Sequence, residues 1–177
     1  MIIWVIVLLL TACGSTKVNT AQSRFYQSFV TRFNVYHNGN EAYKEGLSAQ
    51  EKSHKDNYME IIPLFPVSKE NTRSSGSGSF DKAIEKSQKA IKLHSIKQKP
   101  KKKAGRKLSE KDKLWYAKKE YNPYLHNAWM LMGKAQFQKG EFLEAASTFS
   151  YITRLYSEDP KIVAEARMRM AQCYAEL

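Results

Sequence analysis

The sequence predicts an all-α fold in which helices pair as antiparallel hairpins. Over long stretches, apolar residues recur three and four positions apart, which is the spacing of one helix face. Pro123, Gly140 and Pro160 separate such stretches, at points where a helix must start or stop. Of the 177 residues, 42% are hydrophobic and 26% charged, so the chain is neither disordered throughout nor polytopic.

The first residues have the pattern of an export signal. Residues 2–10 (IIWVIVLLL) are uniformly apolar. As a helix they would rise only about 14 Å, too little to cross roughly 30 Å of hydrocarbon. Leu10-Thr11-Ala12-Cys13 follows and resembles the lipobox of bacterial lipoproteins.

This resemblance implies that residues 1–12 are a signal peptide and that Cys13 carries covalent lipid. Residues 13–22 would then be the lipidated cysteine and its tether. No other cofactor is expected. The alternative is an ordinary buried helix that happens to contain Cys13.

Residues 23–57 predict a degenerate helical hairpin. Its first helix has an aromatic face with spacings of four, four and three, formed by Phe25, Phe29, Phe33 and Tyr36. Asn38-Gly39-Asn40 then predicts a left-handed stop and a cap for the second helix, from Glu41 to about residue 57. Next, two prolines and the run SSGSGS predict an irregular loop over residues 58–78.

A repeat-like helix is predicted over residues 79–96, followed by a basic loop over residues 97–108. The net charge of +12 is concentrated here, because residues 92–119 alone contribute +10. We expect no nucleic acid partner for an exported protein. Three interpretations of the loop stay open: a solvated insertion, a contact with anionic lipid headgroups, or a contact with an acidic protein. The residues of such an anionic contact would be Lys101, Lys102, Lys103, Arg106 and Lys107.

Residues 109–177 resemble the tetratricopeptide repeat, with the last unit truncated. The repeat's aromatic, Leu-Gly, small and closing proline positions are matched in order by Trp129, Met132, Gly133, Phe137, Ala145, Phe149 and Pro160. The resemblance implies hairpins stacked as a right-handed superhelix, with Gly133 packed against Ala145 and a concave protein-binding groove. The last helix would lack a covering partner, which predicts a fragment of a longer protein.

A closer resemblance covers most of residues 10–177. The segments RFYQSFVTRFNVYHNGNEAYKEG, IIPLFPVS, AIEKSQKAIKLHSI and NAWMLMGKAQFQKGEFLEAASTFSYI resemble the amino-terminal region of tetratricopeptide lipoproteins of the SprE/PorW type. These accompany type IX protein secretion and gliding motility. The resemblance implies an outer-membrane lipoprotein that faces the periplasm and binds other subunits of that complex. Retention at the inner membrane is the alternative location.

The sequence carries no motif of a hydrolase, a nucleotide-binding loop or a metal site. The four histidines are scattered, without a pair at helical spacing. We therefore expect neither enzymatic activity, nor a metal, nor a small-molecule substrate. Two other hypotheses stay open: a tetratricopeptide lipoprotein of outer-membrane assembly or cell-wall synthesis, and a regulatory arm of an envelope enzyme.

Overall fold

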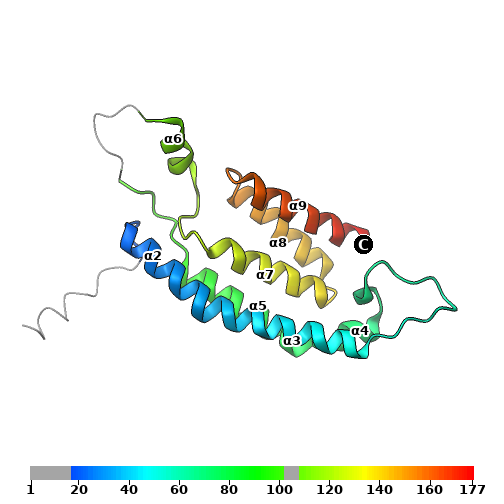
Figure 1. The fold of residues 1–177 in the computed structure, drawn as a ribbon. Helices are drawn as coiled ribbons and strands as arrows, with labels where there is room; N and C mark the ends of the chain where they lie inside the picture. The colour runs from blue at the N-terminus through cyan, green and yellow to red at the C-terminus, as the bar shows by residue number, and fades with distance from the viewer. Residues whose placement is uncertain (1–16, 102–107) are drawn as a thin grey trace, which may run out of the picture.

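A computed structural model describes residues 17–101 and 108–177, and within these ranges it contains helices but no strands (Figure 1). The all-α prediction is confirmed. The helical elements are α2 (Ala21–Val30), the π-helix η1 (Thr31–Tyr36), α3 (His37–Ser53), the 3-10 helix η2 (Pro66–Ser68), α4 (Glu70–Ser74), α5 (Ser77–His94), α6 (Glu110–Ala117), α7 (Leu125–Gln138), α8 (Phe142–Leu155) and α9 (Pro160–Ala175).

The predicted hairpin of residues 23–57 is wrong, because α2, η1 and α3 follow one another without a break. Figure 1 shows them as one long helical rod. Gly39 lies inside this rod and is buried. A β-carbon at this position would lie 3.1 Å from Lys86 Cβ on α5 and 3.2 Å from Leu131 Cδ2 on α7. This glycine therefore serves close helix packing rather than a turn.

The predicted aromatic face of the first helix has the correct period but is not the buried face. Phe25, Phe29 and Phe33 are exposed, whereas Gln27 and Thr31 are buried. The burial of two polar side chains is possible because distant residues bond to them. Asn122 Nδ2 donates to Thr31 Oγ1 at 3.0 Å, and His94 Nδ1 lies 2.6 Å from Gln27 Oε1.

The segment predicted as an irregular loop, residues 58–78, contains two short helices, η2 and α4. The Gly/Ser run is not a flexible link, since α5 already begins at Ser77. Gly76 precedes it with a φ of +81°, and a β-carbon there would lie 2.6 Å from the carbonyl oxygen of Gly46. The apolar part of the loop divides: Ile61 is exposed, but Val67 is buried in the main core.

The second half follows the prediction more closely. Gly140, with a φ of +83°, separates α7 from α8. Asp159 caps α9 through hydrogen bonds from the next backbone amides, with Pro160 in the first turn. Ser109 and Asp112 form a capping box at the start of α6. α7 begins at Leu125, two residues after the predicted boundary at Pro123.

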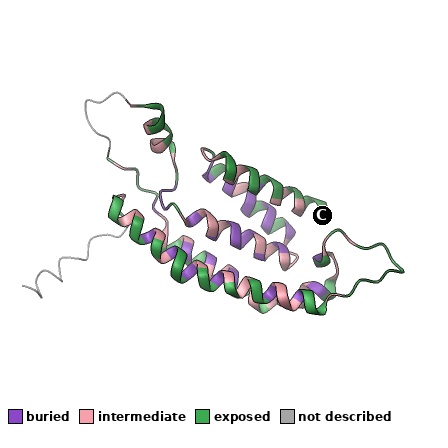
Figure 2. Ribbon diagram, viewed as in Figure 1, coloured by how far each residue is buried: buried purple, intermediate pink, exposed green. Residues whose placement is uncertain are grey.

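Consecutive long helices are also neighbours in space. α3 packs on α5, α5 on α7, α7 on α8 and α8 on α9, while α6 stands apart (Figure 1). Figure 2 shows buried residues along the facing sides of these helices and exposed residues on the outer sides of the array. The largest core cluster joins α7, α8 and α9 around Phe149, Ile152 and Cys173. A second cluster joins α5 to α7 through Phe80, Ala83 and Ala135.

Candidate functional site

The α7–α8 hairpin is held at close range by a glycine against an aromatic ring. A β-carbon at Gly133 would lie 2.7 Å from Cε1 and Cζ of Phe149. The prediction placed Ala145 opposite Gly133, but the ring of Phe149 supplies the nearest atoms. Ala145 is fully buried in the same core. A larger residue at position 133 would displace Phe149.

The other predicted repeat-packing residues divide by burial. Met132 and Phe137 are buried, and Trp129 is partly buried against the α7–α8–α9 core. Pro160 is exposed and occupies the first turn of α9. Six of the seven positions thus lie in or against packed helix contacts, and the seventh shapes a helix start.

An equivalent glycine–aromatic contact, not predicted from the sequence, joins α3 to α5. A β-carbon at Gly46 would lie 2.7 Å from Cε1 of Phe80, whose side chain is fully buried. The available signal was a glycine within a helical pattern, which marks either a weak helix or a close approach. Its partner lies 34 positions along the chain, across an irregular loop, so spacing alone does not identify it.

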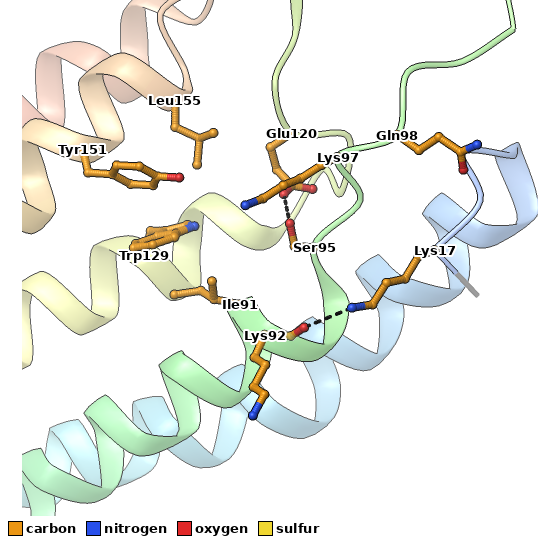
Figure 3. A pocket seen from close by; sticks show the side chains of 10 residues that line it. All are labelled: Lys17, Ile91, Lys92, Ser95, Lys97, Gln98, Glu120, Trp129, Tyr151 and Leu155. Carbon is orange, nitrogen blue, oxygen red and sulfur yellow. Dashed lines mark hydrogen bonds between the residues drawn. The ribbon is translucent and has the colours of Figure 1, made fainter. Parts of the chain in front are cut away.

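A cavity of about 450 Å³ opens between α5, α7 and α8 (Figure 3). Its apolar side is formed by Trp129 and Tyr151, whose ring centroids are 4.8 Å apart. The rings belong to different helices of one hairpin. The remaining lining residues come from several segments: Lys17, Ile91, Lys92, Ser95, Lys97, Gln98, Glu120 and Leu155. Because these segments are far apart in the sequence, no local sequence motif predicts this cavity.

Most of the charged side chains that line the cavity are basic. Three lysines line it, and Figure 3 shows the side chain of Lys97 extending past Glu120 towards Trp129. The Trp129 indole nitrogen is shielded from solvent, and no described residue accepts a hydrogen bond from it. The cavity therefore offers ammonium groups beside two aromatic rings. This set suits a partner with carboxylate or carbonyl oxygens beside apolar groups.

Glu120, the acidic residue of the cavity lining, is already engaged. One carboxylate oxygen accepts from Ser95 Oγ at 2.5 Å. The other accepts from the backbone amides of Ile96, Tyr121 and Asn122 at 2.8–3.0 Å. The side chain is buried. It fastens the end of α5 to the segment before α7, so its role is structural.

The insertion that contains the basic loop begins after Ile96 and ends at Glu120, beside the cavity. The Tyr121 amide donates to the Ile96 carbonyl at 2.9 Å, which closes the base of the insertion. Lys101 is exposed. Lys102, Lys103, Arg106 and Lys107 lie outside the described residues, as does Cys13. The structure therefore tests neither the lipid attachment nor most of the proposed anionic contact.

Buried titratable groups lie in the packing interfaces. Burial raises the pKa of the Cys173 thiol to about 11, and it raises the pKa of Tyr156 far above its usual range. Burial also lowers the pKa values of His94 and His126. Within residues 17–101 and 108–177, no cluster of three or more His, Cys, Asp or Glu residues is arranged to hold a metal ion.

Comparison with family models and with curated proteins finds no match to this chain. None of the helices in the described part of the chain has the length and apolar content needed to cross a membrane.

Proposed function

We propose that this protein is a lipid-anchored scaffold of tetratricopeptide type, which binds other subunits of an envelope complex for type IX secretion and gliding motility. It acts by binding and carries out no reaction of its own. In this proposal the helices belong to a right-handed superhelix, and the protein faces the periplasm from the outer membrane. The resemblance to the SprE/PorW type supplies the biological process.

The observation that carries the scaffold proposal is the repeated glycine–aromatic contact. Gly46 packs on Phe80 between α3 and α5, and Gly133 packs on Phe149 between α7 and α8. In both pairs, α3–α5 and α7–α8, a glycine packed on an aromatic ring lets the two helices approach closely. The two pairs are joined because α5 packs on α7. A stack of helix pairs with nearest-neighbour contacts is the architecture of helical repeat proteins, which present extended binding surfaces.

The cavity beside Trp129 and Tyr151 is the partner site that we assign. Its lysines and its aromatic rings favour a peptide segment that presents acidic and apolar side chains. An aromatic pair with a polar rim is also the composition expected at the centre of a protein interface. The proposal places the partner across α5, α7 and α8.

Site-specific cross-linking in the bacterium that carries this protein tests the site. A photoreactive amino acid at Tyr151 should cross-link to a subunit of the secretion or motility complex, identified by mass spectrometry. The matched control is the same label at Leu143, which is on α8, is exposed and does not line the cavity. Equal cross-linking from both positions would reject the cavity as the partner site.

Deletion of the gene tests the process. The deletion strain should lose secretion of type IX substrates and spreading on surfaces. Normal secretion and spreading would reject this assignment while leaving the helical scaffold in place.

The lipid anchor is tested separately by Cys13→Ala. The wild-type protein should incorporate labelled fatty acid and fractionate with membranes, whereas the variant should do neither. A variant that still fractionates with membranes, together with an unlabelled wild type, would reject lipidation at Cys13.

A further inference from the structure

A row of exposed aromatic side chains runs along the amino-terminal half of the long helical rod. The exposed fractions are 73% for Phe25, 55% for Tyr26, 52% for Phe29 and 57% for Phe33. The ring centroids of Phe25 and Phe29 are 6.2 Å apart, and those of Phe29 and Phe33 are 4.9 Å apart. The three phenylalanines thus form a continuous apolar strip, which we call the aromatic strip.

The fold does not use this strip. The same stretch of helix is held to the body by Gln27, Thr31 and Val35, which are buried. Four large aromatic residues gathered on one exposed surface are unusual for a protein without a partner there. The strip therefore indicates a contact surface.

The charged side chains in the sequence segment that carries the strip have one sign. From residue 14 to residue 40 the sequence contains no aspartate or glutamate, but it contains Lys17, Arg24 and Arg32. The Arg32 guanidinium lies 5.0 Å from the centre of the Phe33 ring. Aromatic side chains accompanied by arginine and lysine are characteristic of helices that lie in the interface of an anionic bilayer.

The described residues at the start of the basic loop, 97–101, lie beside the start of the same helix. Asn19 Nδ2 donates to the Gln98 carbonyl at 2.7 Å, and Lys17 Nζ donates to the Lys92 carbonyl at 3.4 Å. Residues 86–109 also contain no acidic residue. Figure 1 shows the start of α2 and the extended segment of residues 97–101 at the same end of the molecule. Two basic regions far apart in sequence are thus joined at the end where the aromatic strip begins.

We propose that this end of the protein lies on an anionic lipid surface, with the aromatic strip in the headgroup region and the neighbouring lysines and arginines against phosphate groups. A second copy of the chain fits this surface poorly, because both copies would bring positive charge to the contact. A membrane carries the opposite charge and needs no shape complementarity. In one respect this inference rests on the proposed function: the lipid on Cys13 would hold the strip, which begins twelve residues later, close to the bilayer.

Vesicle binding by residues 17–177 tests the surface without the anchor. These residues contain every helix and core cluster described above. The protein should co-sediment with vesicles of phosphatidylglycerol and phosphatidylcholine, and binding should be at least about tenfold weaker with phosphatidylcholine alone or in high salt.

The decisive variant replaces Phe25, Phe29 and Phe33 by serine. It should bind the anionic vesicles at least about tenfold more weakly. The matched control replaces three exposed apolar residues on α8 and α9, Leu143→Ser, Met168→Ser and Tyr174→Ser, and should bind like the wild type. Absence of wild-type binding, or equal binding by the strip variant, would overturn the proposal.

A second measurement does not depend on how well the triple variant folds. An environment-sensitive fluorophore on Phe29→Cys should shift its emission to shorter wavelength with anionic vesicles, whereas the same label on Leu143→Cys should not. Cys173, the other thiol in residues 17–177, is fully buried, so labelling is selective. An unchanged emission at residue 29 would contradict insertion of the strip.

Sedimentation of the same protein without vesicles tests the alternative that a second copy of the chain covers the aromatic strip. We expect a monomer, and a dimer that disappears in the strip variant would overturn the membrane proposal in favour of self-association. Since residues 17–177 lack Cys13, failure of these experiments leaves the lipid anchor untouched. Failure of fatty-acid labelling likewise leaves vesicle binding untouched.

Discussion

Gly133 lies directly against the ring of Phe149, so that a β-carbon at residue 133 would be 2.7 Å from two ring atoms. Gly133→Leu should therefore destabilise the protein by on the order of 1–3 kcal/mol, because a larger side chain overpacks the contact between α7 and α8. Chemical unfolding with urea measures this. Partner cross-linking from Tyr151 should decrease as well, since Tyr151 is carried by the helix that Phe149 positions.

The matched control for that variant is Gly78→Ala. Gly78 lies in the first turn of α5, and a β-carbon there would have no neighbour within 4 Å. Replacing this glycine should be neutral or stabilising by up to about 1 kcal/mol, because alanine restricts the unfolded chain. Equal losses from both glycines would mean that Gly133 has no special packing role.

Glu120→Ala should cost at least about 3 kcal/mol. The carboxylate accepts hydrogen bonds from Ser95 and from three backbone amides, and each bond to a buried charged group is worth about 1.5–3 kcal/mol. Glu120→Gln should recover part of the loss, since its carbonyl oxygen still accepts. Glu144→Ala, at an exposed position of α8, is the control and should change the free energy of unfolding by less than about 0.5 kcal/mol.

The sequence predictions are correct where the structure depends on local contacts and wrong where it depends on contacts between distant residues. The helix boundaries at Gly140 and Pro160 were predicted correctly, because a positive φ and a proline in the first turn of a helix are local properties. Gly39 was misinterpreted as a turn because its reason is the approach of Lys86 and Leu131, which local spacing does not reveal. Such contacts become visible only when the helices are placed in space.

The aromatic strip shows the same limit in the choice of helix face. Its spacing correctly indicated a helix, and hydrophobicity alone would bury the strip. The opposite face is buried instead because Asn122 and His94 provide partners for Thr31 and Gln27. The lining of the cavity was equally out of reach, since its residues converge from distant segments.

Acidification should destabilise the protein through two partly buried histidines, His94 and His126. Burial lowers the pKa values of His94 and His126 in the folded state, so the unfolded chain takes up protons on these rings at a higher pH. Their contribution to stability is complete above about pH 6.5 and is lost as the pH falls through the unfolded value. The urea midpoint should therefore be lower at pH 5.5 than at pH 7.5.

His126→Gln should reduce this pH dependence, because glutamine does not take up a proton in the unfolded chain. A midpoint that rises on acidification in the wild type would contradict the argument.

Replacing Lys101, Lys102, Lys103, Arg106 and Lys107 by serine should leave folding nearly unchanged. The base of the insertion is closed by the bond from Tyr121 to Ile96 and by Glu120, none of which involves these five residues. Circular dichroism should show the same helical content, and stability should change by less than about 0.5 kcal/mol per site. A large loss of stability would mean that the segment packs on the fold.

The same variant should bind anionic vesicles more weakly at low salt, because each lysine or arginine near such a surface contributes about 1 kcal/mol. Unchanged binding would confine the lipid contact to the aromatic strip and its own arginines.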